Sequence, residues 1–140
     1  MLLIGFGMNG LALAQPGPDC GQAMAPQRCA NYRQGWLSCN DLPDSAQRAC
    51  TEAFTPALTC QRNRDNQACL ALQAAQAACE GSQGLARRLC VRERLPLPDC
   101  SHAADQVRCQ QRAMAERNCA ESAGQSAREC IRKALLPDGN

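Results

Sequence analysis

Cysteine is the residue type whose number and spacing point most directly to chemistry in this sequence. The chain of 140 residues contains 12 cysteines and a single histidine, His102. Thiols ligate metals, catalyse redox exchange or pair as disulfides, and zinc motifs and redox catalysts usually place two such groups about two to four residues apart. No pair of cysteines comes that close here. The spacing favours structural disulfides, with a thiolate site for copper or zinc as the alternative.

Hydrolytic chemistry has little support in the sequence. A Ser-His-Asp site would have to use His102, which lies beside Cys100, and no nucleophile-elbow motif G-x-S-x-G occurs. We therefore predict that the protein is not an enzyme, that it has no catalytic residues, and that it needs no cofactor.

The cysteines recur with a period of 40 residues, in the pattern C-x8-C-x9-C-x10-C-x9. This period predicts three tandem repeats, at residues 15–56, 57–96 and 97–140. Outside the cysteines, only one position is identical in all three copies: an arginine two residues before the fourth cysteine, which is Arg48, Arg88 or Arg128. We interpret this arginine as structural, satisfying carbonyls at a neighbouring helix end or pairing with an acidic residue.

Caps and helix breakers predict two helices in each repeat. Asp65 and Asp105 suit helix N-caps, Pro26 suits the first turn, and prolines follow the second helix of each copy. The expected first helices span 26–39, 66–79 and 106–120, and the expected second helices span 44–55, 84–95 and 125–135. Nothing reads as a strand, so we expect an all-α chain of three disulfide-stapled helical hairpins, in a solenoid-like or compact array.

Helix geometry limits how the four cysteines of a repeat can pair. Cys29 and Cys39 lie about 15 Å apart on one helix, which is too far for the Cα separation of under about 7 Å that a disulfide needs. Cys39 and Cys50 face each other across a short turn, and Cys20 lies just upstream of Cys29. The favoured scheme is therefore Cys20–Cys29, Cys39–Cys50, Cys60–Cys69, Cys79–Cys90, Cys100–Cys109 and Cys119–Cys130.

Read from Cys29, the spacing C-x9-C-x10-C-x9-C resembles the twin CX9C, or coiled-coil-helix-coiled-coil-helix, proteins. That resemblance implies a disulfide-locked α-hairpin with a different pairing. Its pairs would be Cys29–Cys60 with Cys39–Cys50, and Cys69–Cys100 with Cys79–Cys90. The sequence departs from the family at Pro56 and Pro96, which interrupt the second helix, and we interpret the similarity as convergent.

A second resemblance covers nearly all of the chain after residue 14. Pro98-Asp99-Cys100, Arg108-Cys109, Cys119, a turn with Gly124, and Arg128-Glu129-Cys130 resemble the repeats of uncharacterised exported cysteine-rich proteins of proteobacteria. The resemblance implies a periplasmic or secreted location and carries no known activity.

Residues 1–14 read as a secretory signal peptide. The segment is apolar and uncharged, ends in Ala12-Leu13-Ala14, and is shorter than the roughly 20 residues of a membrane span. We expect cleavage after Ala14, a mature chain without a transmembrane segment, and an oxidising compartment in which disulfides persist. The usual positively charged start is missing, which leaves open whether Met1 is the true start.

The charge of the chain and its apolar residues indicate which kind of partner to expect. The net charge is only +2 and the pI is about 8.0, whereas nucleic-acid-binding domains usually exceed about 9, so we predict no nucleic-acid partner. We expect a non-enzymatic structural or interaction scaffold whose partner is another envelope or extracellular protein. The apolar residues of the first repeat are either local core or partner contacts: Tyr32, Trp36, Leu37 and Phe54.

Overall fold

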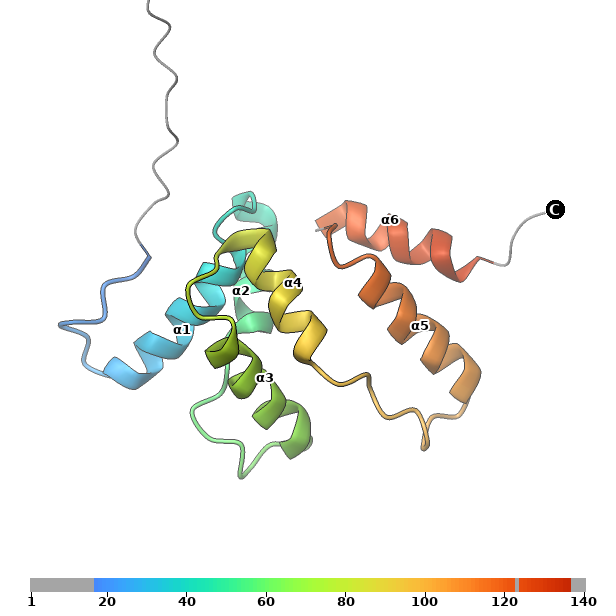
Figure 1. The fold of residues 1–140 in the computed structure, drawn as a ribbon, viewed down its shortest axis with the longest axis horizontal. Coiled ribbons are helices and arrows are strands. Elements are labelled where there is room, and N and C mark those ends of the chain that lie inside the picture. Colours follow the sequence, from blue (N-terminus) through green and yellow to red (C-terminus); the bar gives the residue numbers. More distant parts are fainter. Residues whose placement is uncertain (1–16, 123, 137–140) are drawn as a thin grey trace, which may run out of the picture.

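The computed structural model describes residues 17–122 and 124–136, and this part of the chain contains six helices and no strand. The helices form three consecutive hairpins (Figure 1), which confirms the all-α prediction. None of the described helices is long and apolar enough to cross a membrane. The helices are α1 (Pro26–Cys39), α2 (Asp44–Phe54), α3 (Asn66–Ala78), α4 (Gly84–Arg94), α5 (Gln106–Asn118) and α6 (Gly124–Leu135).

The helices begin where the sequence places their caps. The Asp65 carboxylate accepts the Ala68 N–H at 2.8 Å, and the Asp105 carboxylate accepts the Arg108 N–H at 2.9 Å. Such caps satisfy donors that have no partner within the helix. The helices α3 and α5 end slightly earlier than predicted, because Cys79 and Cys119 already serve as their C-caps.

Six disulfides staple the hairpins, and all of them follow the favoured sequential scheme. In each repeat one bridge ties the incoming loop to the first helix, and the other crosses the turn between the two helices. Their Cα–Cα separations run from 5.6 Å to 6.0 Å, within the range that disulfides adopt. The alternative pairing of Cys29 with Cys60 does not occur, since each of these residues is bonded within its own repeat.

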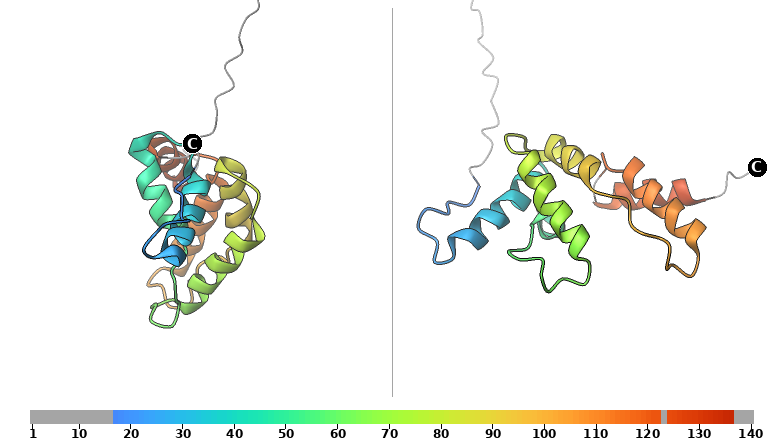
Figure 2. Two further views of the ribbon diagram at one scale, coloured as in Figure 1. Left: turned by 90° about the vertical axis from the view of Figure 1, so that its left-hand side faces the viewer. Right: turned by 60° about the horizontal axis from the view of Figure 1, so that its bottom comes forward.

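The first two repeats share one hydrophobic core. Its buried members come from both hairpins: Cys39, Phe54, Ala75, Cys79 and Val91. Helix α1 packs against both α2 and α4, so the second hairpin closes over the first. Among the described residues, none from the third repeat joins this cluster. Figures 1 and 2 show α5 and α6 beyond the C-terminal end of α4, on the far side of the molecule from α1.

The first hairpin is the most tightly closed of the three because of a glycine. A Cβ atom on Gly35 would lie 2.1 Å from the Thr55 Oγ1 and 2.6 Å from the Thr51 carbonyl oxygen. The amide of Asn31 also donates to the Pro56 carbonyl at 3.1 Å, across the same contact. The positions equivalent to Gly35 in the other repeats are Ala75 and Ala115, so those hairpins cannot close to the same distance.

Candidate functional site

The arginine shared by all repeats is buried only in the second one, where Arg88 has 3% of its surface exposed. Its guanidinium donates to the Ser38 carbonyl at 2.8 Å and to both carboxylate oxygens of Asp41, at 3.0 Å for Oδ2. The Leu85 N–H donates to the same Oδ2 at 3.0 Å. A Cβ on Gly84 would lie 2.9 Å from the Asp41 Cγ, so a glycine is needed for this approach. These contacts, which we call the Arg88 latch, hold the second repeat against the first.

The electrostatics of this latch follow from its geometry. The hydrogen bond from Arg88 is the main cause that lowers the pKa of Asp41, and the charge of Arg88 acts in the same direction. The carboxylate is therefore held in its ionised form, and its role is to anchor a helix end.

The same arginine has different surroundings in the outer repeats. The Arg48 side chain is 90% exposed and pairs with Glu52, one turn along the same helix, at 3.3 Å. Arg128 is also exposed. The second repeat has Gly81 where the first repeat has Asp41, so it brings no carboxylate at the position that would meet Arg128.

A network of buried polar groups completes the contact between the first two repeats. The Gln76 amide donates to the Phe54 carbonyl at 2.6 Å and to the Ser38 hydroxyl at 3.1 Å. The Arg87 guanidinium donates to the Gln76 side-chain oxygen at 2.9 Å and to the Cys79 carbonyl at 2.9 Å. Desolvation lowers the pKa of Arg87. No buried side-chain nitrogen or oxygen in the described residues lacks a hydrogen-bond partner. The polar groups of this network are therefore all hydrogen-bonded within the fold.

The four apolar residues predicted as core or partner contacts separate into two groups. Phe54 is 6% exposed and lies in the shared core, the first of the two alternatives for these residues. Its ring lies 5.5 Å from the Arg92 guanidinium carbon, a cation–π contact. Leu37 is partly buried and lines the crevice between the first two repeats. Tyr32, 47% exposed, and Trp36 line a hollow of about 440 Å³ on the first hairpin.

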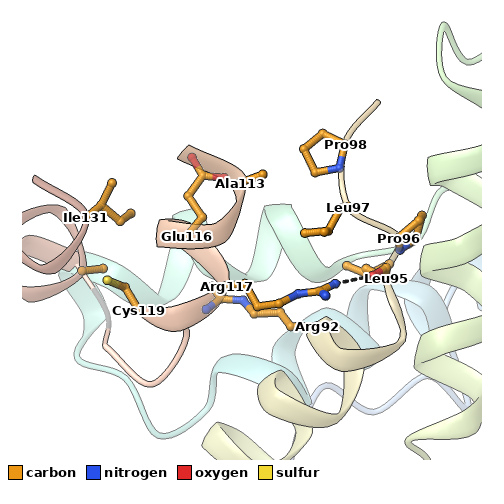
Figure 3. Close-up of a pocket in the computed structure, with 11 residues that line it drawn as sticks. Arg92, Leu95, Pro96, Leu97, Pro98, Ala113, Glu116, Arg117, Cys119 and Ile131 are labelled. Atoms are coloured by element: carbon orange, nitrogen blue, oxygen red, sulfur yellow. Dashed lines mark hydrogen bonds between the residues drawn. The ribbon is translucent and has the colours of Figure 1, made fainter. Parts of the chain in front are cut away.

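The junction between the second and third repeats contains a groove of about 310 Å³ (Figure 3). The connecting segment 95–98 forms one wall, and Ala113 and Ile131 of the third repeat form part of the other. Among the described residues, two side-chain hydrogen bonds cross the junction, each from an arginine to a backbone carbonyl. Arg117 donates to the Leu95 carbonyl at 2.9 Å, and Arg92 donates to the Ala120 carbonyl at 2.8 Å. Desolvation is the largest cause that lowers the pKa of Arg92.

The third repeat also exposes a cluster of large apolar side chains that the sequence reasoning missed. Leu136 is 60% exposed, Val107 64%, Met114 46% and Leu135 37%. Together they line a groove of about 540 Å³ between α5 and the end of α6. The signal that could have found them is the apolar stripe of α6 together with the alanine at position 115, which prevents tight closure of the hairpin. Such a groove can accept apolar side chains of another protein.

The described residues contain no group suited to metal binding. No three His, Cys, Asp or Glu residues of this part of the chain lie close enough together to hold an ion. All twelve cysteines lie in disulfides, so in this state none of them offers the thiolate that a copper or zinc site would require.

Comparison with known proteins adds no further assignment. The chain matches no family model, and searches against the curated proteins and against the solved structures gave no significant match.

Proposed function

We propose that this protein is a non-enzymatic scaffold of the periplasm or the extracellular space, and that it binds another protein through its third repeat. The observation that carries the proposal is the contrast in packing. The first two repeats share one buried core, and their exposed large apolar side chains include Met24, Leu58 and Leu70. In the third repeat, the exposed side chains Val107, Met114, Leu135 and Leu136 line one groove. Contiguous apolar exposure of this kind marks interaction surfaces.

The disulfides support a location outside the cytoplasm. Six bridges in a chain of this length indicate an oxidising, extracytoplasmic environment. The predicted signal peptide, residues 1–14, lies outside the described residues. Location in the periplasm or outside the cell therefore rests on the bridges together with the pattern Ala12-Leu13-Ala14.

The alternative function, thiolate binding or storage of copper or zinc, needs free cysteines. Intact mass under non-reducing conditions counts them, and elemental analysis of protein purified from its host detects bound metal. We expect twelve oxidised cysteines and no stoichiometric metal. Several free thiols together with bound copper or zinc would replace the scaffold proposal by the metal alternative.

Site-specific photo-crosslinking tests the scaffold proposal. A photoreactive residue is placed at Leu136, and a matched control carries it at Leu58, which is 48% exposed but lies outside the third repeat. We expect adducts with one envelope or extracellular protein of the host at position 136 and none at position 58. No adducts at position 136, or equal labelling at both positions, would contradict a binding surface on the third repeat.

A further inference from the structure

Two side chains of the first repeat, Asp41 and Phe54, contact the second repeat alongside the polar network around Gln76. Asp41 places its carboxylate against Arg88, and Phe54 places its ring in the shared core. On the second repeat, the surface that accepts the ring includes Ala75 and Val91, with Leu95 packed beside them. The second repeat therefore carries a receptor face made of one arginine and three apolar residues.

The third repeat has the same receptor residues 40 positions later. Arg128 corresponds to Arg88, and the apolar positions are matched in chemical type by Ala115, Ile131 and Leu135. Because the cysteine spacing contains no insertion, these residues occupy the same helical positions on α5 and α6 as their counterparts on α3 and α4.

The second repeat lacks counterparts of the two side chains, Asp41 and Phe54, that would contact this face. Gly81 stands at the position of Asp41, and Arg94 stands at the position of Phe54. The Arg94 side chain is exposed and turns back along its own helix, donating to the Cys90 carbonyl at 3.2 Å. At these two positions the second repeat therefore supplies neither a carboxylate nor an aromatic ring to the third repeat.

The exposure of the third repeat agrees with an unfilled face. Arg128 is exposed, whereas Arg88 is buried, and Leu135 is 37% exposed, whereas Leu95 packs against the core. Ile131 and Ala127 are partly buried and line the 310 Å³ groove at the junction, and Ala115, which is 4% exposed, lines the 540 Å³ groove beside Leu135.

We infer that the receptor face of the third repeat, Arg128 with Ala115, Ile131 and Leu135, binds a protein segment that presents a carboxylate and an aromatic side chain, as the first repeat presents Asp41 and Phe54. The inference rests on the proposed function and names the class of partner. Electrostatics favour an acidic partner, since α6 carries Arg128, Arg132 and Lys133 against a single acid, Glu129.

A second copy of this chain is a poor occupant of the face. Each copy has one Asp41–Phe54 pair and uses it on its own second repeat. Transfer of that pair to the third repeat of another copy would empty one receptor face for each one filled, with no net gain. The partner is therefore a different protein, and self-association through Arg128 would overturn the inference.

A binding titration with a defined probe tests the inference. The probe is the synthetic, oxidised first repeat, residues 17–57, added to the full chain and followed by calorimetry and by NMR shifts. We expect saturable binding that Arg128→Glu weakens at least tenfold and that the matched control Arg48→Glu leaves unchanged. Probes carrying Asp41→Asn or Phe54→Ala should bind several-fold more weakly. A probe with verified helical circular dichroism and both bridges that fails to bind, or that binds the Arg128→Glu chain equally well, overturns the inference.

A variant of the full chain gives a test that does not depend on the probe folding. Arg94→Phe supplies in the same chain the aromatic ring that the second repeat lacks, and Arg94→Ala is its matched control. We expect amide hydrogen exchange in α5 and α6 to slow at least tenfold in Arg94→Phe relative to Arg94→Ala, because the ring fills the face. Equal exchange in the two variants overturns the inference, even if crosslinking at Leu136 still supports the broader scaffold function.

Discussion

The two junctions between repeats differ far more than the repeats themselves. At the first junction, Asp41 and Phe54 meet a buried arginine and a shared core. At the second junction, two arginines reach single carbonyl oxygens across a groove of about 310 Å³. The cysteine pattern is the same on both sides. Gly81 for Asp41 and Arg94 for Phe54 are two of the substitutions that distinguish the closed junction from the open one, together with the loss of the polar network around Gln76, whose counterpart is Glu116.

The covalent and the noncovalent contacts have different roles in the molecule. Every bridge lies within one repeat, joining cysteines 9 or 11 positions apart. The bridges therefore stabilise each hairpin but do not fix one hairpin against the next. That arrangement depends on side chains at the junctions, which is where the repeats have diverged.

Reduction of all six bridges should have the largest effect on stability, because it removes the disulfides that all three repeats share. Each closed loop of this length contributes about 2–3 kcal/mol through the entropy of the unfolded chain, and six such contributions exceed a typical net stability of about 5–15 kcal/mol. We expect loss of the helical circular-dichroism signal and of a cooperative melt in a phosphine reductant. A reduced sample that keeps its full helical signal and a sharp transition would show that packing alone suffices.

Removal of Arg88, the arginine of the latch, should have the second-largest effect on stability. Arg88→Ala leaves the Ser38 carbonyl and the Asp41 carboxylate without their main donor at a buried contact, and we expect a loss of about 3 kcal/mol in the free energy of unfolding. The same change at the exposed Arg128 should cost under about 0.5 kcal/mol. Urea denaturation of both variants measures the difference. Equal losses at the two positions would mean that the repeated arginine acts within its own hairpin and not between repeats.

The sequence predicted the local structure well because local signals determine it. The Asp65 and Asp105 caps, the prolines after each hairpin and the cysteine spacing specify where the helices begin and end and which cysteines can meet. Each of these features acts over about a dozen residues. The predicted helix limits and the sequential bridges therefore agree with the structure.

The contacts between repeats were not predictable in the same way. The identical arginine suggested one shared role, yet only Arg88 is buried, because its partner Asp41 lies 47 positions away and has no counterpart in the second repeat. Composition groups Phe54 with Tyr32, although Phe54 packs on residues of the next repeat. Such pairings depend on how hairpins stack, and the spacing of residues within one hairpin does not contain that information.

A smaller loss is expected on changing the glycine that closes the first hairpin. Gly35→Ala places a Cβ within 2.6 Å of the Thr51 carbonyl oxygen, which is backbone and cannot turn away. We expect a cost of about 1–3 kcal/mol, visible as a lower melting temperature. The reverse change, Ala115→Gly in the third repeat, should cost only about 1 kcal/mol, through helix propensity. Unchanged stability of Gly35→Ala would show that the first hairpin can open as the third does.

The smallest effect concerns pH at the first junction, where the pKa of Asp41 is lowered, chiefly by the hydrogen bond from Arg88. A carboxyl with a depressed folded-state pKa contributes stability that is present above its unfolded value, about 3.9, and is lost as pH falls through the folded-state value. Because the Asp41 side chain is 39% exposed, solvent screening limits this contribution to about 1 kcal/mol or less. The melting temperature should therefore hold between pH 7 and pH 5 and fall below about pH 4.

Asp41→Asn isolates this contribution, because the amide cannot ionise. We expect the variant to melt lower than wild type at pH 7 and to approach wild type as the pH falls through the acid range. Asp99, whose pKa is lowered by the hydrogen bond from the Ser101 N–H, remains in both chains, so their difference reports Asp41 alone. Glu52→Gln, at the exposed pair with Arg48, is the matched control and should leave the difference near zero. Parallel melting curves for Asp41→Asn and wild type at every pH would place the strength of the first junction in the Phe54 core and not in the ion pair.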